Sequence, residues 1–328
     1  MKEPKVGIVI LTHNQKKLLG ETIQSLIKNT AYKNYKIYVI DNGSENHHDR
    51  FVSRNFNGVR IMREEKNIGF SRGNNLGIKI AKKEYDPDYF ILLNDDLEFI
   101  DRNWIKKAVK YLEKNKKVGI AGVQLLYPDK TFQDAGGYLK KWELTKILKF
   151  KEGAVLDVDH FMGACIIIKK EVIKKIGGLD EIFSPFLFED SDFCLRAKRV
   201  GFEIKVLTSI KIIHKKSKTV GSFSNSKHLF VRFKNDFIFA IRHLSFSDAL
   251  FRIFVFIPLV AIFKKKKDQT NLKNINNFKI RKKFLINIFL LLAAYIFDLV
   301  KIKKILSKDI KNNYCDISKV DNLYKLTL

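Results

Sequence analysis

The sequence predicts an α/β protein with a mostly parallel central sheet flanked by helices, followed by a basic, amphipathic helical C-terminal extension. Two observations predict the sheet: continuous apolar, β-branched runs alternate with segments of helical periodicity, and polar residues follow several of these runs. A third observation predicts the extension, because lysines interleaved with apolar blocks dominate the composition beyond Val220. We therefore expect one domain over residues 1–222 and a basic helical region over residues 223–328.

Four apolar runs near the start of the chain are expected to form strands, at residues 6–11, 37–40, 59–62 and 89–93. Helical patterns follow the first and third runs, and this order is typical of parallel strands joined by crossover helices. In such sheets the ligand binds beyond the carboxyl ends of the strands. The polar residues that end three of these strands should therefore meet at one edge of the sheet.

The next part of the chain predicts strands and helices in a less regular order. Strands are expected at 118–126, 164–168, 204–206 and 211–213, with helices over 170–176 and from near Asp190 to Gly201. Gly177 and Gly178 close the first of these helices, because glycine is favoured just after a helix C-terminus.

Charge and cysteine content restrict the partners and the compartment. The 328 residues include 62 Lys and Arg against 35 Asp and Glu, a net charge of +27, which predicts an anionic partner. Cys165, Cys194 and Cys315 are far apart and show no Cys-x-x-Cys spacing, so we expect a reducing compartment without a disulfide framework. The apolar run at 6–11 is too short for a signal peptide, which predicts a cytoplasmic protein.

Asn94, Asp95 and Asp96 directly follow the predicted strand at 89–93. Adjacent carboxylates repel each other and resist burial, so they are either solvated in a turn or share a positive partner. Asn and Asp are common turn residues, whereas carboxylate oxygens also bind Mg2+ and Mn2+ together with phosphate oxygens. Both a turn and a cation site fit this stretch on its own.

Asp41 follows the second predicted strand in the stretch VIDNGS. Because Asn42-Gly43 is a standard turn pair, Asp41 fits a turn. A carboxylate at the end of a strand can also accept a hydrogen bond from a nucleotide base or a ribose. Its position at the predicted edge of the sheet favours the second interpretation.

Three carboxylates, Glu189, Asp190 and Asp192, lie close together in the stretch FEDSDF. Asp190 is a suitable N-cap, and Asp192 in the first turn of a helix suits the helix dipole. One acid is enough for capping, however, and the apolar segment FSPFLF before them should exclude water. Exclusion of water raises a carboxyl pKa towards the range of a general base, so a base is the alternative to a structural role.

His214 ends an apolar strand and precedes two lysines. A single histidine is usually structural. If Asp96 binds a cation, the imidazole of His214 is also an acceptable ligand for Mn2+.

Seven motifs occur in chain order: VGIVILTHN, VIDNGS, NIGFSRGNN, FILLNDDLEF, FMGACIIIKKEVIKKIGGLDEIF, FEDSDFCLRAKRVGF and IIHKKS. This ordered set resembles the family 2 inverting glycosyltransferases with the GT-A fold of nucleotide-diphospho-sugar transferases, especially their rhamnosyltransferase-like branch. The resemblance covers residues 5–220. Each motif is loose alone, and it is their order that makes the resemblance specific.

The resemblance implies that the carboxyl ends of the strands bind a nucleotide-diphospho-sugar donor. Thr12, Asn14 and Asp41 match the family residues that hold the base and the ribose. Arg72 and Asn74 match residues that lie nearby.

The resemblance also implies a divalent cation, Mg2+ or Mn2+. Asn94-Asp95-Asp96 matches the Asp-x-Asp motif of the family, in which Asp95 faces the ribose and Asp96 binds the metal that bridges the diphosphate. His214 matches a further metal ligand. Asn94 departs from the strict motif, because it replaces the first acid.

For the acceptor, the resemblance implies that Asp190 is the catalytic base. Glu189 and Asp192 match residues that line the acceptor site, and Gly163 and Ala164 match the acceptor loop.

The implied reaction is a single in-line displacement at the anomeric carbon of the sugar, which inverts its configuration. The acceptor is a hydroxyl group of a glycan or a lipid-linked glycan in cell-surface polysaccharide synthesis, and the branch points to rhamnose carried by thymidine diphosphate. Ser184-Pro185 stands where many relatives carry an aromatic residue, which leaves the acceptor pocket undefined.

Two apolar blocks in the basic region, residues 253–263 and 284–297, are shorter than the roughly 20 residues that span a bilayer. Lys264–Lys267 and Arg281–Lys283 lie between them, where a spanning hairpin would place basic residues on the wrong side. Helices lying on an anionic membrane surface, on the inner face of the cell membrane, fit this pattern. The alternative is a helical appendage that packs on the catalytic domain or forms a dimer.

Other classes of protein fit less well. A catalytically silent, nucleotide-sugar-binding scaffold at the membrane would be indicated by loss of Asp190 or Asp96, and both are present. An NAD enzyme or a nucleotidyltransferase on a related sheet lacks support, since LTHNQKK replaces a Gly-x-Gly-x-x-Gly after the first strand. No recognised nucleic-acid-binding motif accompanies the positive charge.

Overall fold

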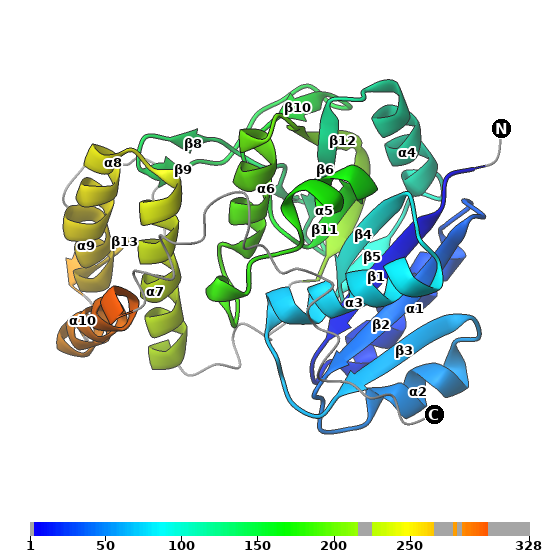
Figure 1. Ribbon diagram of the computed structural model, residues 1–328, viewed down its shortest axis with the longest axis horizontal. Helices are drawn as coiled ribbons and strands as arrows, with labels where there is room; N and C mark the ends of the chain where they lie inside the picture. Colours follow the sequence, from blue (N-terminus) through cyan, green and yellow to red (C-terminus); the bar gives the residue numbers. More distant parts are fainter. Residues whose placement is uncertain (1–2, 216–224, 266–277, 281–283, 301–328) are drawn as a thin grey trace. The chain divides into compact units, whose positions relative to one another are not determined.

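Figure 1 shows the chain as a computed structural model, which describes residues 3–215, 225–265, 278–280 and 284–300. The described residues form two compact units. The first holds residues 3–139 and 144–215, and the second holds residues 140–143 and the segments between 225 and 300. The predicted domain boundary at residue 222 lies outside the described residues.

The first half of the first unit has the predicted alternation of strands and helices. In chain order it consists of β1 (Val6–Thr12), α1 (Lys16–Lys28), β2 (Tyr35–Asn42), α2 (His48–Asn55), β3 (Val59–Glu64), α3 (Phe70–Glu84) and β4 (Tyr89–Asn94). β1 pairs in parallel with β2 and β4, and β2 pairs in parallel with β3. The register places Thr12 beside Asp41 and Leu11 beside Asn94, so these strand ends meet at one edge, as predicted.

The second half of the unit makes the sheet mixed. Its elements are β5 (Leu97–Phe99), α4 (Trp104–Lys114), β6 (Val118–Leu126), β7 (Phe132–Asp134), β8 (Leu139–Lys140), β9 (Glu143–Leu144), β10 (Val155–Asp157), β11 (Cys165–Lys169), α5 (Lys170–Ile176), η1 (Glu181–Phe183), α6 (Glu189–Arg199) and β12 (Glu203–His214). β11 runs antiparallel to β4 and β6, whereas β12 is parallel to β6. The ten-stranded sheet has the order β10-β12-β6-β11-β4-β1-β2-β3, with β5 and β7 paired to β12 and β6.

The two strands expected at 204–206 and 211–213 form the single strand β12, so this part of the prediction was wrong. Thr208 keeps the chain in the sheet, because its backbone N–H and its hydroxyl both donate to the carbonyl oxygen of Ala154, at 3.1 and 2.7 Å. The pairing with β6 is irregular between Leu207 and Lys211, and the strand then continues to His214.

Side chains on the two faces of the sheet pack into two apolar cores. Ile8 and Ile10 of β1 belong to one core, together with residues of α1 and α4. Val9 and Leu11 belong to the other, with residues of α3, α5 and α6. Helices thus cover both faces of the strands, which explains the continuous apolar sequence of β1 (Figure 1). Gly77 allows α3 to pack closely, because a Cβ there would lie 2.2 Å from Cγ1 of Val9.

The second unit is largely helical. It consists of α7 (Asn225–His243), α8 (Phe246–Phe251), the π-helical segment η3 (Arg252–Phe256), α9 (Ile257–Ile262), the short strands β13 (Phe263–Lys265) and β14 (Phe278–Ile280), and α10 (Phe284–Val300). α10 packs against α7 and α9 around Phe233, Ile257 and Leu291. Among the described residues, no helix is both long enough and apolar enough to cross a bilayer.

Candidate active site

The loop after β4 is held at the edge of the sheet by two threonines. Thr12, the last residue of β1, donates a hydrogen bond from Oγ1 to Oδ2 of Asp95 at 2.6 Å. Thr22 of α1 donates to the backbone oxygen of Asp95 and accepts from the backbone N–H of Leu97, both at 2.9 Å. The stretch therefore forms a turn between β4 and β5, but a turn in which the carboxylates of both Asp95 and Asp96 are buried.

The environment of Asp95 favours its neutral form. Burial raises the pKa of Asp95 to about 7, and the negative charge of Asp96 adds to this effect. The hydrogen bond from Thr12 acts in the opposite direction, because it stabilises the carboxylate. A cation bound near this pair would stabilise the ionised form of Asp95.

Asp41 and Asn14 are connected through Ser44. The buried carboxylate of Asp41 accepts a hydrogen bond from the backbone N–H of Ser44 at 3.0 Å and lies 3.3 Å from Nη1 of Arg63. Ser44 Oγ accepts from the backbone N–H of Asn14 at 2.9 Å, and the side chain of Asn14 accepts from the backbone N–H of Glu45 at 2.9 Å. Asp41 thus closes the turn expected at VIDNGS and also lies at the sheet edge. Ser44 was present in that motif, whereas nothing in the sequence pointed to Arg63.

Helix α3 carries Arg72 and Asn74. Asn42, at the end of β2, accepts a hydrogen bond from the backbone N–H of Ile68 at 2.8 Å, which joins the loop before α3 to the sheet edge. Asn74 is buried and donates to the carbonyl oxygen of Phe70 at 3.0 Å. Within the described part of the chain nothing donates to its Oδ1, which leaves a buried acceptor for a hydrogen-bond donor. Arg72 is half-buried.

Asp96 and His214 come together because β5 pairs with the end of β12. The register places Leu97 beside His214, and Nε2 of His214 lies 3.3 Å from Oδ1 of Asp96. Nδ1 of His214 lies 3.0 Å from Oε1 of Gln133 in β7. An amide oxygen only accepts hydrogen bonds, so Nδ1 donates to Gln133 when it carries a proton, and Nε2 is the ring nitrogen that faces Asp96. Gln133 was missed by the sequence analysis, which gave no sign that β7 lies beside His214.

The donor set at Asp96 and His214 fits a divalent cation that substrate oxygens also bind. A carboxylate oxygen and an imidazole nitrogen are ligands that Mn2+ accepts, whereas Mg2+ prefers oxygen. Over the described ranges, no cluster of three or more His, Cys, Asp or Glu side chains could hold a metal ion. Two protein ligands are sufficient for a cation completed by phosphate oxygens and water, and too few for a closed structural site.

Asp190 lies in the first turn of α6 and is held by backbone N–H groups. Its Oδ2 accepts from the backbone N–H of Gly163 at 2.8 Å, and its Oδ1 accepts from the backbone N–H of Ser191 at 2.7 Å. A Cβ at position 163 would lie 3.1 Å from Cβ of Asp190, so glycine permits this approach. Burial raises the pKa of Asp190, and the two N–H groups oppose the shift. The carboxylate is therefore fixed in orientation and is a stronger base than an exposed aspartate.

Glu189 and Asp192 lie on the same helix in different environments. Burial raises the pKa of Glu189 well above its usual range, and the charge of Asp190 adds to the shift. No described group forms a hydrogen bond with its Oε2. Asp192 is fully buried and pairs with Nε of Arg196 at 2.7 Å, while Arg196 also donates to the carbonyl oxygens of Ile176 and Gly178. The environment of Asp192 is thus that of an internal ion pair, and its acceptor role stays a prediction.

Two residues near Asp190 complete this part of the site. Ala164 is buried, and its carbonyl oxygen accepts from the backbone N–H of Asn94 at 3.0 Å, which links the Gly163 loop to β4. Burial lowers the pKa of His160. The negative charge of Asp190 acts in the opposite direction and is the smaller effect. His160 directly precedes the motif FMGAC, and the sequence around it carries no signal of its own for a role at this site.

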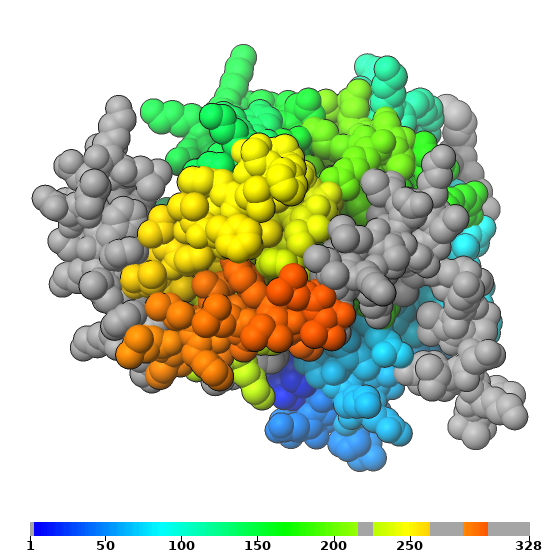
Figure 2. Space-filling view, turned by 60° about the vertical axis from the view of Figure 1, so that its left-hand side comes forward, coloured from blue at the N-terminus to red at the C-terminus, as the bar shows by residue number. Residues whose placement is uncertain are grey.

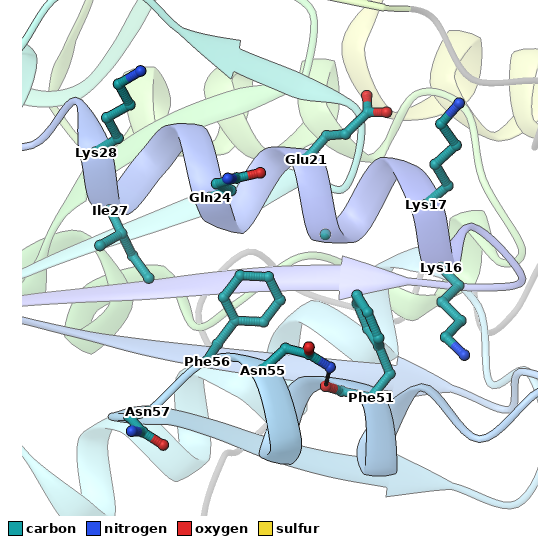
Figure 3. Close-up of a pocket in the computed structure, with 11 residues that line it drawn as sticks. Lys16, Lys17, Glu21, Gln24, Ile27, Lys28, Phe51, Asn55, Phe56 and Asn57 are labelled. Atoms are coloured by element: carbon teal, nitrogen blue, oxygen red, sulfur yellow. Dashed lines mark hydrogen bonds between the residues drawn. The ribbon is translucent and has the colours of Figure 1, made fainter.

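A separate groove of about 1070 Å³ lies between α1 and α2 (Figure 3). Lys16, Lys17, Lys28 and Glu21 line it together with apolar side chains that include Phe51. None of the predicted site residues lines this groove.

Comparison with known proteins assigns the family. The sequence pattern of the family described as glycosyl transferase family 2 matches residues 7–177. The chain belongs to this family. All of the predicted donor residues lie within the matched segment, as do Gly163 and Ala164, whereas Glu189, Asp190, Asp192 and His214 lie beyond it.

Curated relatives of this family 2 chain include named glycosyltransferases. The low-salt glycan biosynthesis hexosyltransferase Agl10 of Haloferax volcanii is 26% identical over 205 residues, which cover 61% of this chain and 65% of the relative. The dTDP-rhamnosyl transferase RfbF of Shigella flexneri is 24% identical over 208 residues, which cover 63% and 67% of the two chains. The chain spans between 17% and 65% of the lengths of Agl10 and two other curated relatives that it matches.

A solved structure supports the fold. The mannosyltransferase PcManGT from Pyrobaculum calidifontis, solved in complex with GDP-Man and Mn2+, matches with a TM-score of 0.54 at 14% identity. The match covers 97% of this chain and 79% of that protein. The chain therefore has the GT-A fold that the sequence motifs predicted.

Proposed function

We propose that the chain is an inverting, metal-dependent glycosyltransferase that moves a sugar from a nucleotide diphosphate to a hydroxyl group of a glycan or a lipid-linked acceptor. The observation that carries the proposal is the Asp96–His214 pair, 3.3 Å apart at the sheet edge where Thr12 binds Asp95. In a family 2 chain with a GT-A fold, this edge is where a donor diphosphate would require a cation. Family membership supports the glycosyl transfer.

The nucleotide end of the donor would be recognised by the groups around β1 and β2. Asp41 is held by Ser44 and Arg63, so its carboxylate is ordered for a base or ribose. The side chain of Asn14 faces the same turn. On α3, Arg72 supplies a positive charge and Asn74 supplies a buried acceptor.

Asp96 and His214 would hold the divalent cation, and Asp95 would face the ribose. When bound, the cation would offset the negative charge that builds up on the departing nucleotide diphosphate. Gln133 holds the His214 ring, and Thr12 holds Asp95, so the two sides of this site are fixed before ligands bind.

Asp190 is proposed as the general base. It would take the proton of the acceptor hydroxyl onto a carboxylate oxygen as that hydroxyl attacks the anomeric carbon, which inverts the configuration. The N–H groups of Gly163 and Ser191 fix the carboxylate. Glu189 is the neighbouring group proposed to face the acceptor, whereas Asp192 supports α6 through Arg196.

The donor sugar and the pathway are proposed from the relatives. Similarity to the dTDP-rhamnosyl transferase of Shigella flexneri supports rhamnose, and similarity to Agl10 supports a hexose. Both relatives, together with an O-antigen biosynthesis protein of Myxococcus xanthus, support a role in surface polysaccharide synthesis. We propose that this role is carried out at the cytoplasmic face of the membrane.

A thermal-shift series with nucleoside diphosphates, each with Mn2+ and with a chelator, tests the donor site. A ligand that binds only the native protein raises its melting temperature, so we expect a metal-dependent rise with one base. Asp96→Asn should abolish the metal dependence, while the exposed Asp129→Asn should retain it. A metal-dependent rise without sugar transfer from the matching nucleotide sugar would favour a silent scaffold. A normal metal-dependent turnover by Asp96→Asn would contradict the proposal.

A further inference from the structure

The polarity of α10 is reversed relative to a helix of a water-soluble protein. Every large residue that it exposes is apolar, and the most exposed include Val300 at 81%, Phe289 at 70%, Leu285 at 69% and Ile296 at 63%. Its polar residues lie on the other side: Asn287 and Asp298 are buried, and Asn287 donates to the carbonyl oxygen of Ala261 at 2.9 Å. A helix on the surface of a soluble domain shows the opposite pattern.

The segment from α8 to α9 repeats this reversal. Its large exposed residues are apolar, with Phe246 at 81% and Phe254 at 67%. Of its two charged residues, Asp248 is half-buried and Arg252 is buried, and Nε of Arg252 pairs with Oδ1 of Asp236 in α7 at 2.5 Å. The guanidinium of Arg252 also lies 5.5 Å from the ring centre of Phe239. In α10 and in the segment from α8 to α9, the most exposed large side chains are therefore apolar, while Asn287 and Arg252 are enclosed.

The exposed apolar residues belong to neighbouring helices. α10 packs against α9, and Figure 2 shows the orange surface of α10 beside the yellow surface of the preceding helical segment. The large exposed apolar residues of α8, η3, α9 and α10, which together we call the apolar face, are Phe246, Leu250, Phe251, Phe254, Val255, Leu259, Leu285, Ile286, Phe289, Leu292, Ile296, Phe297, Leu299 and Val300. Large exposed apolar patches on soluble monomers usually mark an interaction site.

We infer that the apolar face inserts into one leaflet of an anionic lipid bilayer. The charge pattern supports lipid as the occupant: Arg281–Lys283 directly precede α10, and Lys301, Lys303 and Lys304 directly follow it. Basic residues at both ends of an apolar helix bind anionic headgroups while the apolar side enters the acyl region. Within the described residues, α10 is not long enough and apolar enough to cross a bilayer, and basic residues adjoin it in the sequence on both sides.

Buried polar groups inside the second unit agree with this inference. In a medium that cannot form hydrogen bonds, polar side chains have to find partners within the protein. Asp236 and Arg252 satisfy each other, and Tyr295 donates from its hydroxyl to the carbonyl oxygen of Ile253 at 2.5 Å. The inference does not depend on the proposed transfer reaction, because vesicle binding requires no sugar donor.

Flotation of the full chain with vesicles tests the inference. We expect binding to vesicles of phosphatidylcholine with phosphatidylglycerol, weaker binding to phosphatidylcholine alone, and retention of part of the binding in high salt. Phe289→Ser combined with Ile296→Ser should lower the vesicle partition coefficient by about tenfold or more, since two apolar side chains lose their transfer into lipid. The matched control is Leu148→Ser, which changes a side chain that is 72% exposed in the first unit and should leave binding unchanged.

A conservative variant covers the case in which the serine pair fails to fold. The F289W chain should gain tryptophan fluorescence that brominated acyl chains quench. The tryptophan fluorescence gained by the L148W chain should not be quenched. Absence of quenching in the F289W chain, or unchanged flotation of a folded serine pair, would overturn the inference. A second result would also overturn it: the chain forms a dimer without lipid, and the serine pair dissociates this dimer but leaves flotation unchanged. The apolar face would then bind a second copy of the chain.

Discussion

Gln133 orients His214, because Oε1 of Gln133 lies 3.0 Å from Nδ1 of His214 in the buried part of the first unit. We expect Gln133→Leu to remove this acceptor and to let the imidazole rotate and change tautomer. Loss of such a partner of a metal-binding histidine typically weakens metal affinity by about 10- to 100-fold. Calorimetric titration of Mn2+ in the presence of a nucleoside diphosphate measures this affinity.

The control for Gln133 is Gln24→Leu, which alters an exposed glutamine of α1. It should bind Mn2+ like the unmodified chain. Equal affinity in both variants would mean that the contact between Gln133 and His214 has no role in metal binding.

Asp190→Asn should lower kcat by about 10²- to 10⁴-fold if Asp190 is the general base. The amide has the size of the carboxylate and keeps one acceptor oxygen, so it can accept from Gly163 or from Ser191 but not from both. Because neither contact involves the predicted donor residues, the donor affinity should change little. Steady-state kinetics with donor binding measured separately will distinguish these effects. A loss confined to donor affinity would assign Asp190 to binding instead.

The pH dependence of activity follows from the raised pKa of Asp190. A base acts only when it is ionised, so kcat should fall as pH decreases through this pKa and reach a plateau above it. Because burial moves the pKa upward, the fall should occur at a higher pH than the value near 4 of an exposed aspartate. A pH–rate profile measures the midpoint, and a flat profile down to pH 4 would argue against Asp190.

Glu189→Gln should increase stability at high pH. The raised pKa of Glu189 means that the folded state retains its proton where the unfolded state loses it. The free energy of unfolding therefore decreases as pH rises from the unfolded pKa towards the folded pKa, and the glutamine variant escapes this decrease. Urea unfolding at pH 4 and pH 8 should show a gain for the variant only at the higher pH. An equal effect at both pH values would show that burial of this carboxyl does not control stability.

Arg196→Met should destabilise the first unit by about 3–5 kcal/mol, because it leaves the buried carboxylate of Asp192 without its guanidinium. Adding Asp192→Leu to the same chain should recover much of the loss, since both charges are then removed. Urea unfolding of the two variants gives the comparison. If Asp192 instead binds the acceptor, the double variant will regain stability but its KM for the acceptor will rise.

The sheet edge was predictable because it depends on local rules. Apolar runs at 6–11 and 89–93 predicted parallel strands, and parallel strands bring their carboxyl ends together, so Thr12, Asp41 and Asn94 were expected at one edge. The break expected within β12 was wrong because Thr208 finds its hydrogen-bond partner in Ala154, a residue distant in sequence.

The supporting residues could not be predicted in the same way. Gln133 and Arg63 act through contacts with residues distant in the chain, and their own surroundings in sequence have no distinctive pattern. Asp192 looked like an acceptor residue because its neighbours form a motif, and only the fold reveals its pairing with Arg196. The reversed polarity of α10 could not be predicted either. Its sequence is rich in leucine and isoleucine on all sides, so the sequence does not indicate which side packs against the core.

Lys215 gives the end of β12 a mechanical role. Its ammonium group lies 2.8 Å from Glu21 and 3.3 Å from Glu98, and its backbone N–H donates to the carbonyl oxygen of Asp96 at 2.8 Å. His214 is the residue immediately before it, and the chain towards the second unit continues immediately after it. These three attachments fix the backbone at the end of β12, which carries the imidazole of His214 beside Asp96.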